Sequence, residues 1–325
     1  MSNRNTLVVM IFSEPLVSIC IPVYNAVHWL PETLDRLKRQ TYSSIEVIIV
    51  DDHSTDNSLQ IAQAYESDSI QVYSNPKKGG NSARNYAFQM SKGDYIKFMD
   101  ADDYMDDSMI ELQVARLLEE DNPENCIVLS PVIMRFQDGI DLHQVGRSID
   151  HDYSPGIELL IDIWRGKGWN CPHCHLMHHS LVKRSKGWDE TVVKNQDGEY
   201  FGRVYTIADK VVSVKQVNAI WRQTGIGVST KMNDAAMESV LRSYRILADL
   251  ILSYKSDAEH RDICSRYISS CMYSNYPTNK KYIPEMERYM KENGLCFKIP
   301  NQRRLKVLCS IVGWKLTACI FNYYK

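Results

Sequence analysis

The sequence of 325 residues is long enough for one substantial domain with an appended region, or for two domains at most. Its 44% hydrophobic residues, 24% charged residues and formal net charge of -2 exclude a disordered chain and a nucleic-acid-coating protein. The charge is uneven, because residues 280–325 hold ten Lys or Arg against three Glu, a net +7 that leaves the remainder at -9. A basic end on an acidic body predicts contact with an anionic surface.

Strand and helix patterns alternate through the first 120 residues. Val17 to Pro22 alternates apolar with small residues as a strand does, and the next leucines fall at helical spacing. Glu46 to Val50 is a continuous apolar run, typical of a strand buried on both faces of a parallel sheet. Further helices are expected at Ser58 to Tyr65, Ser82 to Met90 and Ser108 to Glu119, and further strands at Ile70 to Tyr73 and Tyr95 to Met99. This order predicts an α/β fold of βαβ units with a doubly wound sheet.

The second half of the chain has a looser pattern. It suggests a strand at Cys126 to Ser130, a hairpin around Asp138-Gly139 and a helix from Gly156 to Trp164. From Lys231 onward strand alternation is missing and the sequence looks helical. We therefore expect an α/β domain at residues 15–230 and a helical region at 231–325.

Cysteine use and the chain start bear on location. Nine cysteines lie mostly within apolar runs, and no signal peptide is evident, so reduced thiols and a cytoplasmic protein are expected. Leu7 to Phe12 is only six apolar residues, far short of a secretory core or a membrane span. Since the first strand starts at Val17, Met10 is a candidate for the true start.

The most informative segment is Tyr95 to Asp103, an apolar strand followed by carboxylates at Asp100, Asp102 and Asp103. Carboxylates this close repel one another unless a cation neutralises them. Mg²⁺ and Mn²⁺ prefer such oxygens and keep positions open for substrate phosphates. The alternative is a solvated turn that caps the helix at Ser108.

Two more polar segments follow predicted strand ends. Asp51 and Asp52 come directly after the buried Glu46 to Val50 strand, where a carboxylate can accept hydrogen bonds from a base or ribose, or cap the next helix. Lys77 to Asn85 is a basic loop with two glycines leading into a helix, which suits a nucleotide phosphate. Ligands of doubly wound sheets gather at the carboxyl ends of the strands, so these segments are expected to converge.

Four ordered segments together resemble the family 2 glycosyltransferases of the GT-A fold: Ser18 to Asn25, Glu46 to Asp56, Ala83-Arg84-Asn85 and Gly93 to Asp103. The resemblance covers residues 15 to 230. It implies an inverting enzyme of the bacterial polysaccharide type that moves a sugar from a nucleotide diphosphate donor, commonly a UDP-sugar. The acceptor would be a hydroxyl of a glycan or lipid-linked molecule in cell-surface polysaccharide synthesis.

The resemblance also implies roles for individual residues. It puts the donor nucleotide against Pro22, Tyr24, Asn25, Asp52, Arg84 and Asp100. Asp102 is expected on a Mn²⁺ or Mg²⁺ ion, with Asp103 assisting.

The catalytic base of such enzymes lies in an acidic pair at the start of a helix, after a Gly-aromatic-Asp-Glu turn. This chain has that turn at Gly187 to Glu190, followed by Gln196 and Asp197. Asp197 is therefore the predicted base, which takes the proton of the acceptor hydroxyl. The first acid of the pair is Gln196 here, Glu199 is not excluded, and the alternative for Asp197 is a helix N-cap.

The family's aromatic-Arg segment, on the loop that closes over the diphosphate, resembles Trp221-Arg222 with Ser229-Thr230 further on. Arg222 is predicted to bind phosphate through its fork of donors. The histidine common at the next motif position is Thr224 here, a departure that affects the closing-loop contacts.

Two further features were weighed against plainer explanations. The Cys171 to His179 segment is rich in thiols and imidazoles, but its spacing matches no common zinc module, so an acceptor or core role is favoured. Leu305 to Tyr324 is apolar, but Lys306 and Lys315 interrupt it, so a full membrane span is not expected. Peripheral contact of residues 281–325 with anionic lipid is one hypothesis, and a helix packed on the catalytic domain is the other.

The α/β pattern is also compatible with two rival functions. A dinucleotide-dependent oxidoreductase needs a Gly-x-Gly-x-x-Gly turn after the first strand, and Ile21 to Asn25 contains no glycine. A catalytically inactive nucleotide-sugar-binding protein on the same fold remains the alternative, because a fold does not guarantee activity.

Overall fold

The computed structural model describes residues 14–143, 149, 151–225, 233–299, 309 and 311–323. The expectations for Leu7 to Phe12, for Met10 and for Ser229-Thr230 fall outside these residues. So do residues 305–308, 310 and 324 of the apolar C-terminal run.

The centre of the molecule is a seven-stranded sheet with the order β10-β6-β9-β4-β1-β2-β3. Its strands are β1 (Val17–Val23), β2 (Ile45–Asp51), β3 (Ile70–Ser74), β4 (Tyr95–Phe98), β6 (Cys126–Leu129), β9 (His175–His178) and β10 (Lys210–Ser213). β1 pairs in parallel with β2 and with β4, so the strand order reverses at β1. All but the first residue of β2 are buried, as expected for an apolar strand covered on both faces.

A smaller four-stranded sheet stands beside the first, in the order β5-β11-β7-β8. It consists of β5 (Tyr104–Met105), β7 (Val132–Arg135), β8 (Asp141–His143) and β11 (Ala219–Arg222). β7 and β8 pair antiparallel around Gly139, whose φ of 83 suits a turn, so the predicted hairpin is confirmed. Because β5 follows the acidic segment directly, this sheet places β11 against Asp102 and Asp103.

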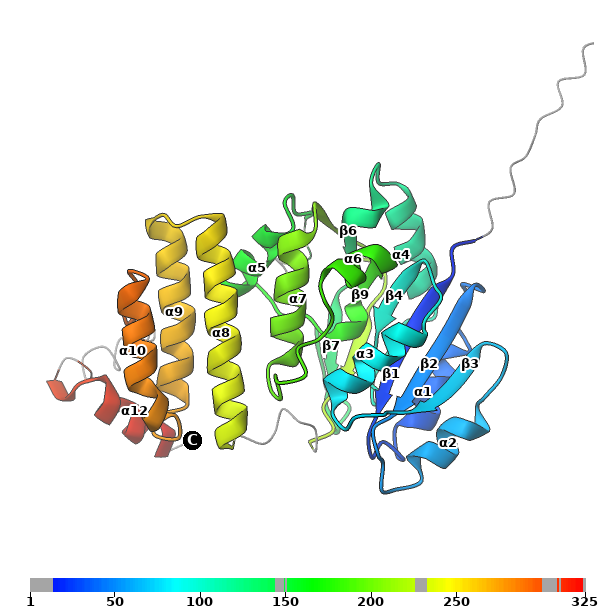
Figure 1. Cartoon of the computed structure of the whole chain (residues 1–325), viewed down its shortest axis with the longest axis horizontal. Helices are drawn as coiled ribbons and strands as arrows, with labels where there is room; N and C mark the ends of the chain where they lie inside the picture. Colours follow the sequence, from blue (N-terminus) through cyan, green and yellow to red (C-terminus); the bar gives the residue numbers. More distant parts are fainter. Residues whose placement is uncertain are drawn as a thin grey trace, which may run out of the picture.

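Helices surround the sheets and continue into the C-terminal region (Figure 1). Those of the first half are α1 (Leu30–Leu37), α2 (Ser58–Ala64), α3 (Gly80–Met90), α4 (Met109–Leu118), α5 (Ile157–Trp164), α6 (His179–Arg184) and α7 (Gln196–Ile207). The later ones are α8 (Asp234–Tyr254), α9 (Ala258–Ser274), α10 (Ile283–Glu292) and α12 (Trp314–Tyr323). Short 3-10 turns lie at η1 (Pro123–Asn125), η2 (Pro172–Cys174) and η4 (Lys280–Tyr282).

The α/β fold class and the helical C-terminal region are confirmed. In Figure 1, α7 stands between the sheet and α8, and α8, α9 and α10 stand side by side beyond it. α8 packs on α7, and α9 packs on both α5 and α8, in one apolar core with the sheet. The boundary at residue 230 stays a prediction.

One strand departs from the predicted parallel order. β9 runs antiparallel between β4 and β6, with Ile96 opposite Met177 and Leu129 opposite His175. The start of β9 therefore lies at the carboxyl end of β4, which brings η2 beside the acidic segment.

Candidate active site

The loops after β1 and β2 form one wall of the region at the carboxyl edge of the sheet that we call the crevice, the edge where open α/β sheets bind their ligands. Asn25 has a positive φ of 50, its N–H donates to Ser54 Oγ at 3.1 Å, and its Oδ1 accepts from Thr55 N–H at 2.8 Å. Tyr24 is 51% exposed, with the Lys78 ammonium 5.5 Å from its ring centroid. An exposed aromatic ring next to a cation suits a base and its phosphates.

Pro22 lies one residue before the end of β1 and is paired with Val50 of β2. It belongs to the same wall, two residues before Tyr24.

Asp52 organises the loop that leads into α3. Its Oδ1 accepts from Asn75 Nδ2 and from Gly79 N–H, both at 2.7 Å. Gly79 has a φ of 139, and α3 begins at the next residue, two residues earlier than predicted. Within the Lys77 to Asn85 loop that suits a phosphate, the Gly79 amide is therefore already bound by a carboxylate.

The neighbouring Asp51 is buried and only half satisfied. Its Oδ2 accepts from Ser54 N–H at 3.2 Å, while Oδ1 has no hydrogen-bond partner among the described residues. A buried carboxylate oxygen without a partner is costly, so a donor group from a ligand would be favoured there.

Arg84 joins three elements at the centre of the crevice. Its Nη2 donates to Asp100 Oδ1 at 2.6 Å and its Nη1 donates to Gln196 Oε1 at 3.1 Å. The guanidinium lies over the Trp188 ring, 4.6 Å from the centroid. The Arg84–Asp100 ion pair is partly buried. Together with the hydrogen bond to Gln196, it joins α3, the end of β4 and the start of α7.

Asp102 is the half-buried acid of the Asp100 to Asp103 turn. Burial and the nearby Asp100 carboxylate raise the pKa of Asp102 to about 6, although the Thr224 hydroxyl donates a hydrogen bond to it. Thr224, at the family's histidine position, thus contacts the predicted metal ligand directly.

Asp103 lies beneath the crevice. It is 1% exposed, its Oδ1 accepts from Arg222 N–H at 2.8 Å, and its Oδ2 lies 3.5 Å from His173 Nδ1. Burial and the Asp102 and Asp100 carboxylates raise its pKa well above the usual range. These contacts enclose Asp103, so Asp102 is the more accessible of the two predicted metal ligands, and the part of Asp103 in holding a metal ion stays a prediction.

The Arg222 guanidinium is engaged within the protein. Nη1 donates to Glu32 Oε2 at 2.7 Å, Nη2 donates to Thr33 Oγ1 at 2.8 Å, and Nε donates to the Asp102 carbonyl. Arg222 thereby holds the acidic turn through its main chain and its side chain, and its binding of phosphate stays a prediction.

Asp197 lies in the first turn of α7 and faces the same crevice. Burial and Asp100 raise its pKa to about 6, and Arg84 opposes that rise. A carboxylate with its pKa near neutrality inside a crevice is suited to proton transfer.

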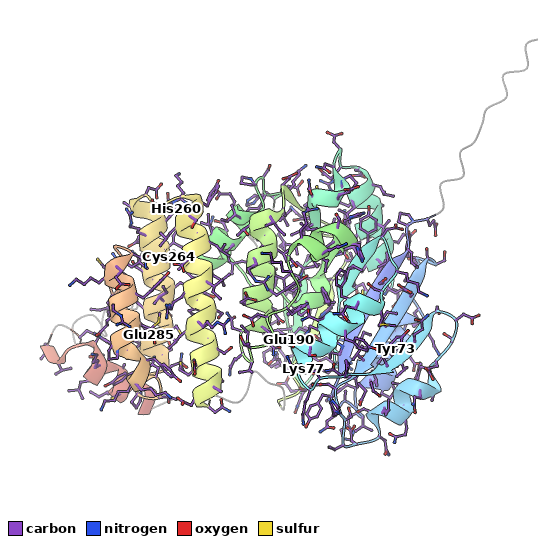
Figure 2. The ribbon with its side chains drawn as sticks, viewed as in Figure 1. Tyr73, Lys77, Glu190, His260, Cys264 and Glu285 are labelled. Carbon is purple, nitrogen blue, oxygen red and sulfur yellow. The ribbon has the colours of Figure 1, made fainter. Side chains whose placement is uncertain are left out.

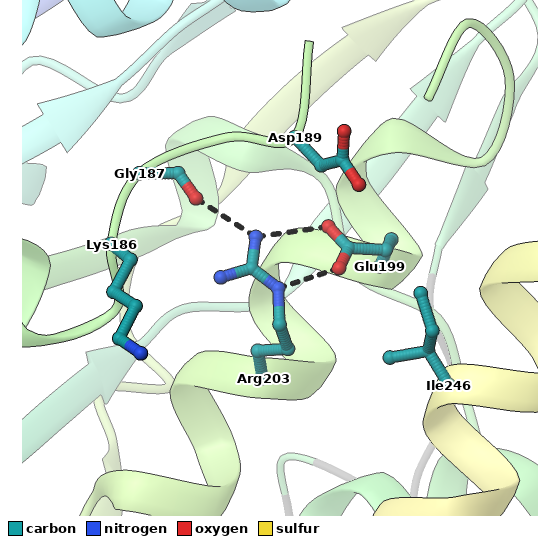
Figure 3. A pocket seen from close by; sticks show the side chains of 6 residues that line it. All are labelled: Lys186, Gly187, Asp189, Glu199, Arg203 and Ile246. Carbon is teal, nitrogen blue, oxygen red and sulfur yellow. Dashed lines mark hydrogen bonds and ion pairs between the residues drawn. The ribbon is translucent and has the colours of Figure 1, made fainter. Parts of the chain in front are cut away.

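Glu199, the other acid considered for the base, lies on a different face of α7. It is 2% exposed and accepts from Arg203 Nε at 2.5 Å and Nη2 at 3.0 Å. Figure 3 shows this pair beside Gly187 and Ile246, in a cavity of about 370 Å³ between the Gly187 turn and α8. Since successive helical residues differ by about 100°, Asp197 and Glu199 point in nearly opposite directions.

The predicted Gly-Trp-Asp-Glu turn is fastened to α3. Asn85 Oδ1 accepts from Trp188 N–H at 2.8 Å and Asn85 Nδ2 donates to Trp188 O at 2.9 Å. A Cβ on Gly187 would lie 2.7 Å from Asn85 Oδ1, and its φ of 74 also favours glycine. Figure 2 shows Lys77 next to Glu190, and these two side chains form a further ion pair.

Helix α8 fixes the segment that precedes Asp197. Ser239 Oγ accepts from Val193 N–H at 3.0 Å and from Lys194 N–H at 3.1 Å, and Ser243 Oγ accepts from Asn195 Nδ2 at 2.8 Å. No sequence pattern had drawn attention to either serine, because a serine in a helix carries no chemistry of its own.

Removing both hydroxyls, as Ser239→Ala with Ser243→Ala, is expected to lower kcat about fivefold to tenfold, because the start of α7 loses its anchors. The KM for the donor should stay within about twofold, since no donor residue is touched. Steady-state kinetics and a thermal melt check this, with the exposed Ser253→Ala on the same helix as the control. Equal kcat in the double variant and the control would contradict a positioning role for the two serines.

The Cys171 to His179 segment is a buried part of the core next to the crevice. His175 Nε2 lies 2.6 Å from Tyr205 Oη, and its ring stacks on Phe201 at 3.6 Å. Within the described part of the chain, no three His, Cys, Asp or Glu side chains are arranged to hold a metal ion.

The architecture is that of the GT-A nucleotide-sugar transferases. S. aureus TarS, residues 1–349, superposes with a TM-score of 0.63 at 19% identity, covering 86% of this chain and 80% of that one. The same protein in complex with UDP-GlcNAc gives a TM-score of 0.63 at 18% identity over the same shares.

The chain belongs to glycosyl transferase family 2, whose sequence profile matches residues 18–184, just over half of the chain. The glycosyltransferase GlyG of Streptococcus pneumoniae is 38% identical over 109 residues, which are 33% of this chain and 36% of that protein. The chondroitin synthase of Pasteurella multocida is 36% identical over 108 residues, 33% of this chain and 11% of that protein. The alignment thus spans about a third of GlyG and less of the synthase.

Proposed function

We propose that this glycosyltransferase is an inverting enzyme that moves a sugar from a UDP-sugar to a hydroxyl of a glycan or lipid-linked acceptor. The observation that carries the proposal is the position of Asp197, beside the Arg84–Asp100 pair and with a raised pKa of about 6. In this mechanism the carboxylate takes the proton of the acceptor hydroxyl as its oxygen attacks the anomeric carbon, and the nucleoside diphosphate leaves from the opposite face.

Three features support the donor side. The Asp51 oxygen, which lacks a partner in the described part of the chain, and the exposed Tyr24 ring suit a base, and Arg84 suits negative charge. TarS, which shares the fold, has been solved with UDP-GlcNAc and with UDP. We infer a UDP-sugar on this basis.

A Mn²⁺ or Mg²⁺ ion fits the acidic turn. Asp102 is a hard oxygen ligand whose ionisation is disfavoured by burial and by Asp100, so a cation there would relieve a repulsion that Arg222 and Thr224 offset only in part. Such ions are commonly held by one or two carboxylates together with substrate phosphates, so Asp102 suffices on the protein side. When bound, the ion would offset the charge on the leaving diphosphate.

The proposal is tested by incubating the purified protein with a panel of nucleotide sugars and Mn²⁺, and following release of nucleoside diphosphate by mass spectrometry. We expect one UDP-sugar to be hydrolysed or transferred, and EDTA to abolish the reaction. Binding of UDP without turnover of any donor would favour the inactive binding protein. The absence of both would overturn the nucleotide-sugar assignment.

We further propose a role in cell-surface polysaccharide synthesis, with peripheral contact between the C-terminal region and anionic lipid. Among the described helices none has the length and hydropathy that crossing a membrane requires. α12 packs on α9 and buries Thr317 and Ala318, but leaves Leu316 and Ile320 exposed on another face, next to Lys315. An apolar face beside a lysine suits the surface of an anionic bilayer, and Lys315 is also paired with Glu287 at 3.2 Å.

Full-length protein is expected to float with phosphatidylglycerol vesicles and not with phosphatidylcholine vesicles. Leu316→Glu with Ile320→Glu should reduce the floated fraction at least about fivefold, because carboxylates oppose burial and repel the lipid. Leu118→Glu, at an exposed leucine of α4, serves as the control. Equal flotation of the double variant and the control would leave the packing of α12 on α9 as its only role.

A further inference from the structure

Cys171 and Cys174 occupy the two ends of one 3-10 turn. η2 spans Pro172–Cys174, and the Cys174 N–H donates to the Cys171 carbonyl at 3.3 Å. Cys171 is the extended residue before the turn, with φ -110 and ψ 163, and three steps of about 2.0 Å separate its Cα atom from that of Cys174 by about 6 Å along the axis. That separation lies within the range of about 4.4–6.8 Å that a disulfide spans.

The two thiols also interact. Each thiol shifts the pKa of the other, and Cys174 Sγ donates to the Cys171 carbonyl at 3.0 Å. Burial raises the pKa of Cys171. Burial acts on Cys174 in the same sense, but the Cys171 thiol, His175 and Lys97 outweigh it and lower the pKa of Cys174. This asymmetry provides one nucleophilic sulfur and one resolving thiol.

A buried lysine stands beside the pair. Lys97 of β4 is fully buried, and its Nζ donates to Gln113 Oε1 at 2.7 Å, to the His173 carbonyl at 2.8 Å and to the His175 carbonyl at 2.9 Å. None of these acceptors carries a charge. Burial lowers the pKa of Lys97 to about 7. A thiolate formed when Cys174 gives up its hydrogen bond to the Cys171 carbonyl would supply the charge that pairs with this buried ammonium.

We propose that Cys171 and Cys174 form a thiol–disulfide site, which a low-molecular-weight disulfide such as oxidised glutathione converts to an intramolecular disulfide. The Cys174 thiolate attacks one glutathione sulfur, which forms a mixed disulfide and releases one glutathione thiolate. The Cys171 sulfur, once deprotonated, attacks Cys174 Sγ and releases the second. Two electrons and both thiol protons pass to two glutathione molecules, so the exchange is balanced.

The disulfide would act on the acid crevice through the two histidines of the segment. His173 lies between the cysteines, with Nε2 at 3.8 Å from Cys171 Sγ and Nδ1 at 3.5 Å from Asp103 Oδ2. His175 follows Cys174 and contacts Phe201 and Tyr205 of α7, the helix that carries Asp197. Moving the two sulfurs into bonding distance shifts the contact of His173 with Asp103 and the contacts of His175 with α7. The oxidised protein therefore turns over its donor more slowly. This consequence rests on the proposed function, whereas formation of the disulfide does not.

The test equilibrates the full-length protein in glutathione buffers from about -150 to about -320 mV, long enough for the buried thiols to exchange through local opening. Free thiols are then alkylated and the peptides mapped by mass spectrometry. We expect a Cys171–Cys174 peptide two hydrogens lighter than its reduced form in the oxidising buffers, restored by dithiothreitol. The exposed Cys296→Ser variant should behave identically. Modification of Cys296 alone, with Cys171 and Cys174 fully alkylated in the most oxidising buffer, overturns the proposal.

Donor turnover is measured on the same samples. The oxidised protein should have a kcat about tenfold below that of the reduced protein. A Cys171→Ser variant should show no redox dependence, and its folding is checked by circular dichroism. If the disulfide forms while turnover is unchanged, the coupling to the crevice is wrong. If it forms and neither state turns over any donor, the proposed function fails and the thiol–disulfide site stands.

Discussion

Asp197→Asn is expected to lower kcat about 10²- to 10⁴-fold, the range that a positioned general base contributes. Affinity for UDP should remain within about twofold, because Asp197 acts on the acceptor side. The wild-type kcat/KM should rise with pH through about 6 and then level off, since the raised pKa of Asp197 keeps its carboxyl protonated below that value. Steady-state kinetics from pH 5 to 9, with UDP binding by calorimetry, measures both effects.

The matched control is Glu199→Gln on the same helix. Glu199 is buried against Arg203, so the substitution should lower the melting temperature and leave kcat per folded molecule within about threefold. A loss of kcat at Glu199 with normal turnover in Asp197→Asn would reverse the assignment of the base. If kcat/KM of Asp197→Asn still rises with pH through about 6 as in the wild type, another group is responsible for that rise.

Asp102→Asn is expected to abolish most turnover and to stabilise the metal-free protein. Its folded-state pKa of about 6 lies above the ordinary value of 3.8, so the folded protein binds more protons between these pH values and stability falls as pH rises through them. Above about pH 6 the ionised carboxylate costs ~1–3 kcal/mol, which asparagine does not incur. We expect a higher melting temperature at pH 8 without metal, little difference at pH 4, and a kcat at least about 10²-fold lower.

Asp107→Asn provides the comparison, because Asp107 is a more exposed carboxylate near the same turn, paired with Arg39 at 2.6 Å. Its melting temperature and kcat should stay close to wild type. If Asp102→Asn melts lower than wild type at pH 8 without metal, the carboxylate is compensated in the folded state and the charge argument for a cation fails. Added Mn²⁺ should raise the melting temperature of the wild type and not that of Asp102→Asn.

The predicted elements of the first 120 residues match the structure closely, because their apolar runs are long and regular. The strand at Glu46 to Val50 lies within β2, and the helix at Ser108 to Glu119 corresponds to α4. The helix expected at Ser82 begins two residues earlier, at Gly80, because Asp52 binds the Gly79 amide from a distant loop. The small second sheet was foreseen only at its hairpin, since β5 has two residues and no detectable period.

The antiparallel course of β9 could not be predicted. His175 to His178 is four residues long, and a short apolar run indicates neither its partner nor its direction. Its placement nevertheless decides that η2 and both of its cysteines lie beside the acidic turn. The role of Ser239 and Ser243 could not be predicted either, because they position the segment before Asp197 from 45 or more residues away.

The sequence by itself determined the fold class, because repeated apolar strands that end in polar residues leave few alternatives to a nucleotide-binding α/β sheet. The family followed from the resemblance of four ordered segments, not from the strand pattern. It also indicated which carboxylates lie at strand ends. Only the tertiary structure separated their surroundings, with Asp102 in the crevice, Asp103 enclosed beneath it, and Asp197 and Glu199 on different faces of α7. The physical reason is that burial and hydrogen bonding to distant segments set the pKa and the access of a carboxylate, and neither property is encoded by its neighbours in the chain.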